Sequence, residues 1–364
     1  TGLENLQLPE GITAIEANAF ADCIKLKTVI LPTTLETIGE GAFRGCYSLQ
    51  IMSLPFIGQA AGTETGEEAL FGWIFSIPEF DAEKDAMREV TQIALIDGET
   101  TEVTYYIPMD LTKVVIYGET AIGYGAFSGC KDLVALIIKD NGIDAIGDYA
   151  FYDCVNLTYI LDIEAEYPVI VDGEVTHPAF NRDITYTTDD TEDYNIHIYD
   201  EVTSIGNYAF MNCVNVQSVI MPECVETIGD YAFANCTSLT KINEGLINQY
   251  DFDNIGTFED GYDWQTRDNL YNYLMPEGMT SIGAFAFFNN GLVTSIYIPN
   301  TVTFMGEGIF GGCSSIEMLS IPFVGGVNAK SEDYAYNQTM GYMFYTEEVD
   351  GCTAVEQNNI TYYI

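Results

Sequence analysis

The chain has 364 residues, 48% of them hydrophobic, and its 55 acidic side chains outnumber 12 basic ones, which gives a net charge of −43. A surface this acidic repels phosphate backbones and anionic lipid headgroups, which argues against nucleic acid as a partner. No stretch approaches the ~18 consecutive apolar residues of a membrane helix, so we expect no membrane insertion by this segment.

The first residues already follow a repeating frame. Leu8 and Pro9 return as Leu31 and Pro32, 23 residues later. Solenoid proteins usually carry a polar capping unit, and none is visible at either end of this sequence. We therefore expect residues 1–364 to form a single solenoid that is truncated at both ends from a longer protein.

An Ala-Phe pair marks the period along the chain. Neighbouring pairs are 23 or 24 residues apart wherever no insertion intervenes. A constant period in the twenties is typical of a solenoid, and here it predicts about eight stacked coils. The phenylalanines of these pairs are Phe20, Phe43, Phe127, Phe151, Phe210, Phe233 and Phe287, and an Ile-Phe pair adds Phe310.

Each unit contains a strand, a corner and a residue that fills the core. Val29 and Leu31 flank Ile30 with the alternation of a short strand that buries one face. Pro32 has no N–H group and ends the strand. Phe43, behind a small alanine, is expected to fill the middle of its coil. Stacked coils then place like residues on like residues.

The pattern C-x-x-L-x-x-I-x-L-P-x-x-L-x-x-I-G-x-x-A-F-x-x-C recurs over most of the chain and resembles the BspA-type (Treponema pallidum-type) leucine-rich repeat. The resemblance implies a β-rich leucine-rich-repeat solenoid of the α/β horseshoe class. Its 23-residue coils would contain short parallel strands, short helical turns and irregular insertions. The resemblance also implies a surface protein of an anaerobic bacterium, in a family whose best-known members bind host matrix proteins such as fibronectin and fibrinogen.

Four insertions interrupt the period, at about 57–104, 163–198, 243–272 and 324–361. The first and last insertions are related, because "SLPFIG", "FGWIFS" and "TYYIP" around the first match "SIPFVG", "MGYMFY" and "TYYI" around the last. This predicts a larger duplication, and the alternation of residues in "FGWIFS" and "MGYMFY" predicts a strand in each copy. In the third insertion, "DFDNIG" lacks EF-hand ligands at Ile255 and Tyr262, which favours a solvated loop over a calcium site.

Residues with catalytic or metal-binding chemistry are scarce. His177 and His197 have no partnered nucleophile, and the chain has no C-x-x-C pair and no phosphate-binding glycine loop. We therefore expect no catalytic residue, no metal site and no cofactor. Asn290 once replaces a cysteine that recurs at one repeat position, which predicts free thiols that face backbone at a corner. These cysteines are Cys23, Cys46, Cys130, Cys154, Cys213, Cys236 and Cys313.

One position per strand is expected to point away from the core. It holds Ile30, Ser53, Ile137, Leu161, Ile220, Tyr297 and Ser320. Five of the seven are large and apolar, and such a stripe favours an interaction surface. The alternative is that the insertions fold over this strand face. Aromatic residues of the insertions would either cover it or stack on a ligand, and they are Phe71, Trp73, Phe75, Tyr342 and Phe344.

These observations favour a non-enzymatic, extracellular segment that binds host matrix or other cell-surface proteins. One alternative is a carbohydrate-binding or polysaccharide-processing solenoid, which Trp73 and Trp264 would favour if they were exposed and paired over a groove. The other alternative is a passive spacer that displays another domain, against which the apolar strand face argues.

Overall fold

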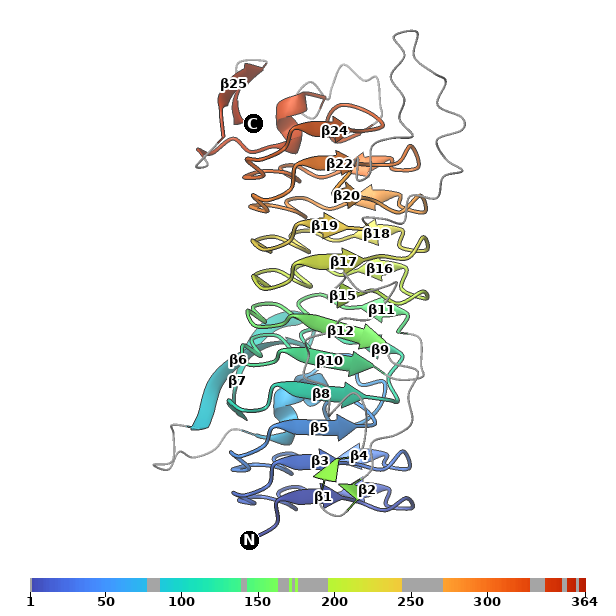
Figure 1. Ribbon diagram of the computed structural model, residues 1–364, viewed down its shortest axis with the longest axis vertical. Coiled ribbons are helices and arrows are strands. Elements are labelled where there is room, and N and C mark those ends of the chain that lie inside the picture. Colours follow the sequence, from blue (N-terminus) through green and yellow to red (C-terminus); the bar gives the residue numbers. More distant parts are fainter. Residues whose placement is uncertain are drawn as a thin grey trace.

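The computed structural model describes residues 2–76, 86–138, 143–162, 170–171, 174–175, 196–243, 271–327, 338–348, 352–357 and 360–364. These residues form a tall stack of coils, with the two ends of the chain at opposite ends of the stack (Figure 1). The predicted β-rich solenoid is confirmed, and in the described residues helical structure is limited to short turns.

The main element is a parallel sheet of short strands. Val29 pairs in register with Leu6 on one side and Met52 on the other, so like positions align as predicted. In the described part of the chain the sheet has twelve strands. In spatial order they are β1 (Asn5–Gln7), β3 (Thr28–Ile30), β5 (Ile51–Leu54), β8 (Lys113–Ile116), β10 (Ala135–Ile138), β12 (Tyr159–Asp162), β15 (Ile196–His197), β17 (Ser218–Ile220), β19 (Lys241–Ile242), β20 (Tyr273–Leu274), β22 (Ser295–Tyr297) and β24 (Met318–Ser320).

A second ladder of two-residue strands lies just before each Ala-Phe pair. Its members are β2 (Ala14–Ile15) and β4 (Thr37–Ile38), which pair with each other, and a group of six: β9 (Ala121–Ile122), β11 (Ala145–Ile146), β16 (Ser204–Ile205), β18 (Thr227–Ile228), β21 (Ser281–Ile282) and β23 (Phe304–Met305). Neighbouring coils approach each other closely after these strands, because a Cβ on Gly229 would lie 2.6 Å from the backbone nitrogen of Asn207. Glycine after the isoleucine therefore lets neighbouring coils touch.

Stacked phenylalanines fill the core, as predicted. The ring of Phe210 lies 5.1 Å from the rings of Phe151 and Phe233, with interplanar angles of 18° and 5°. All three side chains are fully buried. Such offset stacking adds to the free energy that burial of the rings contributes.

Five of the seven repeated cysteines donate to backbone carbonyl groups, as the Asn290 exchange indicated. The Cys236 thiol donates to the carbonyl oxygen of Phe210 at 3.2 Å, and the Cys46 thiol donates to that of Phe20 at 3.1 Å. Burial raises the pKa of both thiols to about 12. They are therefore protonated, and each satisfies a carbonyl group at the corner of the coil below.

The count of about eight coils is too low for the strand sheet. Strands β8, β15 and β20 each follow an insertion rather than a described Ala-Phe corner, so the described sheet has more strands than the chain has regular pairs. At β20, Tyr273 fills the core instead, and its hydroxyl donates to the carbonyl oxygen of Leu239 at 3.3 Å.

The first insertion folds as two turns and a long hairpin. The 3-10 turns η1 (Glu67–Ala69) and η2 (Phe71–Ile74) precede the antiparallel strands β6 (Met87–Ile96) and β7 (Glu99–Pro108). The hairpin projects from the side of the stack (Figure 1). The buried carboxylate of Glu119 holds the start of the insertion by accepting from the amides of Ile57 and Gly62, at 2.9 and 3.3 Å.

Two shorter hairpins complete the described elements. The last insertion contains the 3-10 turn η7 (Met340–Met343), followed by β25 (Ala354–Gln357) and β26 (Ile360–Tyr363). In the second insertion, β13 (Ile170–Val171) pairs with β14 (Glu174–Val175). Among the described residues, no helix is both long and apolar enough to span a membrane.

Candidate protein-binding surface

The strand face is less exposed than the sequence predicted. Ile30 and Ile137 are each only 6% exposed, and Ser53 is fully buried. Leu161, Ile220 and Tyr297, like Ser320, are half-buried. The expectation of a continuous exposed apolar stripe is therefore wrong, and its N-terminal half is covered.

Tyr117 accounts for part of this cover. It follows β8 on the outward side of the sheet, because Val114 and Ile116 point into the core. Its hydroxyl donates to the carbonyl oxygen of Leu31, which follows β3. Since β5 lies between β8 and β3, the Tyr117 ring crosses over the end of β5 and shields this part of the strand face.

The insertion aromatics do not cover the strand face and do not form strands. Phe71, Phe75 and Phe344 are buried in the core. Phe71 lies tilted against Phe127 at 5.1 Å, and Phe344 lies tilted against Phe310 at 6.5 Å, so the insertions add rings to the phenylalanine core. The prediction of strands failed because residues spaced for a strand here form the 3-10 turns η2 and η7.

Two further aromatics of the insertions act as corner residues. Trp73 is half-buried, its Nε1 donates to the carbonyl oxygen of Ile38 at 3.1 Å, and its own carbonyl accepts from the amide of Gly41 at 3.0 Å. Tyr342 is half-buried, and its carbonyl accepts from Gly308 at 2.8 Å. Trp264 lies outside the described residues, so no pair of tryptophans over a groove is described.

The predicted duplication is confirmed by matching contacts in the first and last insertions. The amide of Gly72 donates to Gln92 Oε1 at 2.6 Å, and the amide of Gly341 donates to Gln357 Oε1 at 2.9 Å. In each copy a tyrosine ring packs so closely on the glycine that a Cβ would collide with it. These rings belong to Tyr105 in the first copy and Tyr362 in the last.

The corners beside the first and last insertions carry glycine where the backbone φ is positive. Gly125 and Gly129 have φ angles of 62° and 69°. A Cβ on these residues would lie 1.7 Å from the carbonyl oxygen of Ile93 and 2.4 Å from that of Thr91. Strand β6 therefore passes directly over this corner, and only glycine leaves room for it. The corresponding glycines of the other two corners beside insertions are Gly41, Gly45, Gly308 and Gly312.

Four successive corners between the first and last insertions carry aromatic rings at the first of these positions. We call Tyr149, Tyr208, Tyr231 and Phe285 the aromatic column; their φ angles are 58°, 58°, 55° and 57°. The rings stack in this order at 4.7, 5.1 and 4.8 Å. All four side chains are half-buried. A side chain in the left-handed region costs about 1 kcal/mol per residue, which ring stacking offsets.

The chain's own insertions close both ends of the aromatic column. Tyr124 tilts onto Tyr149 at 5.5 Å, and its hydroxyl is 2.8 Å from Thr100 Oγ1 on β7. Tyr345, in the last insertion, lies edge-on to Phe285 at 5.3 Å with an interplanar angle of 86°. The aromatic column thus fills the interval between the two duplicated insertions.

A polar column runs beside the aromatic one. It consists of Asp153, Asn212, Asn235 and Asn289, again at positive φ. The side-chain Nδ2 of Asn235 donates to Asn212 Oδ1 at 2.9 Å, and the side-chain Nδ2 of Asn289 donates to Asn235 Oδ1 at 3.0 Å. We refer to the aromatic and polar columns together as the corner surface.

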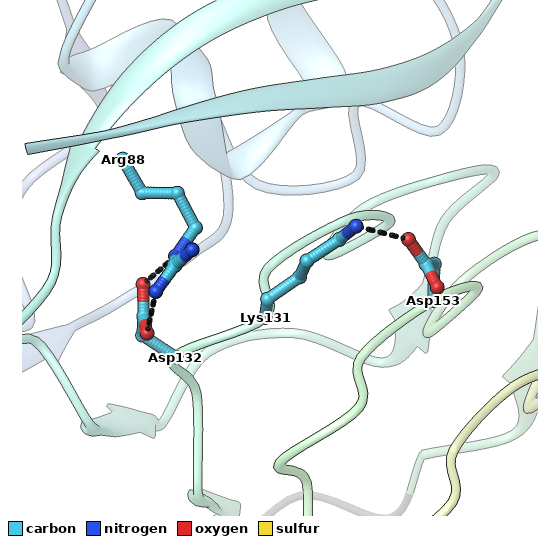
Figure 2. Close-up of polar contacts among 4 residues, drawn as sticks. All are labelled: Arg88, Lys131, Asp132 and Asp153. Atoms are coloured by element: carbon cyan, nitrogen blue, oxygen red, sulfur yellow. Dashed lines mark hydrogen bonds and ion pairs between the residues drawn. The ribbon is translucent and has the colours of Figure 1, made fainter.

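Two ion pairs anchor the N-terminal end of the corner surface (Figure 2). Arg88, on β6, bonds Asp132 through two nitrogens, with Nη2 2.9 Å from Oδ1. The neighbouring Lys131 points instead to Asp153, with Nζ 2.8 Å from Oδ2. One pair therefore holds the hairpin to the solenoid, and the other places an ammonium group at the first residue of the polar column.

The corner surface is acidic. Its four corner segments, residues 145–154, 204–213, 227–236 and 281–290, contain no lysine, arginine or histidine. Burial raises the pKa of Tyr149 to about 12, and the neighbouring phenols and Asp148 contribute. Asp230 acts in the same direction on Tyr208 and Tyr231. The phenols are therefore neutral hydroxyl groups that lie beside aspartate side chains.

Sequence reasoning missed the corner surface, although a signal was present. The corners next to the first and last insertions contain "GAF" or "GIF", the four corners of the aromatic column contain "YAF" or "FAF", and the first corner contains "NAF". The residue before the Ala-Phe pair thus distinguishes the corners of the aromatic column from those next to the first and last insertions. That distinction depends on φ at this position, which the repeat spacing alone does not reveal.

The remaining site predictions lie partly outside the described residues. His177 and the "DFDNIG" loop fall there, while burial lowers the pKa of His197 in β15. Within the described ranges, no group of three or more His, Cys, Asp or Glu side chains is arranged to hold a metal ion.

Comparisons with known proteins agree with the repeat pattern. Residues 1–71, 102–171, 188–317 and 254–341 match the family described as "BspA type Leucine rich repeat region", in six copies. Among solved structures, the chain is similar to a leucine-rich-repeat protein of Treponema pallidum, with 17% identity, 66% of this chain and 68% of that chain covered, and a TM-score of 0.26.

Two other solved structures show a similar relation. A leucine-rich cell-surface protein of Faecalibacterium prausnitzii is 20% identical, with 92% of this chain and 90% of that chain covered and a TM-score of 0.27. The pneumococcal vaccine antigen PcpA is 14% identical, with 85% and 68% covered and a TM-score of 0.31. No curated protein matches the chain in sequence.

Proposed function

Because the chain belongs to the BspA-type leucine-rich-repeat family, we propose that it is an extracellular protein-binding segment of a bacterial cell-surface protein and that it acts without catalysis. The observation that carries the proposal is the corner surface. Half-exposed tyrosines are kept there in a strained backbone conformation, on the corners that lie between the first and last insertions. Tyrosine is enriched at protein interfaces, because it offers a large rigid ring and a polar tip.

The open half of the strand face is the second place where a partner could bind. Ile220 and Tyr297 are half-buried there, whereas Ile30 and Ile137 are buried and cannot serve. The corner surface is favoured over this half because its aromatic residues are contiguous and stacked. Both surfaces run along the stack, so one assay can compare them.

The proposal is tested by equilibrium binding of the purified segment to immobilised fibronectin and fibrinogen at physiological salt. A Tyr208→Gly, Tyr231→Gly variant removes two rings from the aromatic column, and glycine accepts the positive φ at both positions. We expect this variant to bind at least about tenfold more weakly, as loss of aromatic interface residues does.

An Ile220→Ser, Tyr297→Ser variant of the strand face is the matched control, and we expect it to bind as the natural chain does. Circular dichroism melting of both variants separates a loss of binding from a loss of fold. Weaker binding by the control alone would move the site to the strand face. Absence of saturable binding by the natural chain would exclude both proteins as partners.

A further inference from the structure

The corner surface presents hydroxyl and carboxylate oxygens to solvent, and its ring faces are already occupied. Successive rings of the aromatic column stack at 4.7 to 5.1 Å, so only their edges and hydroxyl groups remain accessible. A sugar ring stacks on an exposed aromatic face, and this arrangement offers none within the column. The groups that a partner can reach are therefore tyrosine hydroxyls and nearby aspartate carboxylates.

The carboxylate of Asp230 is available for a partner. Its Oδ1 accepts from the amide of Ala284 at 2.7 Å. Within the described part of the chain, Oδ2 has no hydrogen-bond partner, and the residue is exposed. Asp148 occupies the same position two coils earlier, and Asn207 lies between them. The row thus alternates charged and neutral groups along the aromatic column.

The chain itself shows which groups dock at the two ends of this surface. At one end, the ammonium group of Lys131 pairs with Asp153, the first member of the polar column (Figure 2). At the other end, the ring of Tyr345 packs edge-on against Phe285 and Phe288, at 5.3 and 5.6 Å. A cation and an aromatic edge are therefore the two groups that already bind here.

We propose that the corner surface binds a basic polypeptide segment, with lysine or arginine side chains at its carboxylates and aromatic or aliphatic side chains along the ring edges. This proposal rests on the proposed protein-binding function and specifies the partner's chemistry. Charge complementarity supports it, because the corner segments contain no basic residue and the chain carries a net charge of −43. A second copy of the chain is disfavoured as the occupant, because it would bring the same charge to the same surface.

The test compares two double variants that each remove two negative charges. Asp148→Asn with Asp230→Asn alters the corner surface, and the coil between them already carries asparagine at the same position, as Asn207. The backbone hydrogen bond of Asp230 Oδ1 is retained, so the fold is preserved. The control variant, Glu16→Gln with Glu36→Gln, changes exposed carboxylates in the first two coils.

The probe is a synthetic peptide that repeats Lys-Gly-Tyr-Gly, and the matched probe replaces each lysine with glutamate. Binding is measured by isothermal titration calorimetry at about 0.15 M ionic strength, where distant charges are screened. We expect the lysine peptide to bind the natural chain. Its affinity for the Asp→Asn variant should be about tenfold lower, and its affinity for the control should be within about twofold of that for the natural chain. We expect no binding of the glutamate peptide.

Equal weakening by both variants would overturn the proposal, because it would mean attraction by overall charge alone. Unchanged binding by the Asp→Asn variant, or no binding of the lysine peptide at all, would also overturn it. The same variants on immobilised fibronectin and fibrinogen separate the two proposals. If the Tyr208→Gly, Tyr231→Gly variant loses that binding and the Asp→Asn variant does not, the corner surface is supported as the binding site and a basic partner is excluded. If neither variant changes it, both proposals fall.

Discussion

At the residue scale, one backbone angle explains a choice that the repeat leaves open. Position 149 and its equivalents require a positive φ, where glycine fits without strain. Under strand β6 the residue is Gly125, because no side chain fits there. On the four corners of the aromatic column it is tyrosine or phenylalanine, whose ring stacks on the rings of neighbouring corners. The residue type at this position therefore depends on whether a strand lies over the corner and on whether neighbouring rings are present for stacking.

The phenylalanine stack makes a direct prediction about stability. Phe233→Ala removes a fully buried ring that lies between Phe210 and Phe287. We expect it to lower the free energy of unfolding by about 3–5 kcal/mol, through lost burial and the cavity left behind. Phe304→Ala is the matched control, because that ring is 45% exposed. Guanidinium denaturation checks both, and equal shifts of the midpoint would contradict the account.

Glu119 gives a second prediction, on pH dependence. Burial raises its folded-state pKa above the ordinary value of 4.5, although two amides donate to it. A raised pKa favours folding while the carboxyl is protonated, and that contribution is lost as pH rises through the folded-state pKa. We expect the free energy of unfolding to fall over this range relative to a Glu119→Gln variant. Parallel pH profiles for the two proteins would contradict it.

At the element scale, the hairpin β6–β7 depends on the corner beneath it. Gly125→Ala places a methyl group 1.7 Å from the carbonyl oxygen of Ile93, so the hairpin must shift outward. We expect faster amide exchange in residues 87–96 of this variant. Gly98→Ala is the control, since Gly98 has φ 82° but no atom within 4 Å of the added carbon. It isolates the backbone strain of about 1 kcal/mol, and equal exchange in both variants would contradict the collision.

The elements also show how far sequence reasoning reaches. The period of Phe20 and Phe43 predicted the stacked core, and the paired motifs predicted the duplication, because both depend on local pattern. The exposure of Ile137 could not be predicted, because cover of a sheet face comes from distant segments. The turn around Trp73 was missed because four residues carry too little periodicity to separate a 3-10 turn from a strand.

At the scale of the whole molecule, charge opposes compactness. The net charge of −43 is confined to one stack of coils, so its self-repulsion destabilises the folded chain at low salt. Raising the ionic strength from about 0.01 to 0.15 M shortens the Debye length from about 30 to 8 Å. We expect the melting temperature at pH 7 to rise by several degrees, as measured by circular dichroism. The rise should vanish near pH 4.1, the isoelectric point, and a rise of equal size there would contradict this cause.

The placement of the two chain ends has a mechanical consequence for a protein held at a surface. They lie at opposite ends of the stack (Figure 1), and the hydrogen bonds between coils run along the same axis. A pulling force on the two ends therefore loads those bonds in series and peels off one coil at a time. Each regular coil of 23 residues releases about 80 Å of extended chain, so the molecule lengthens in steps under load.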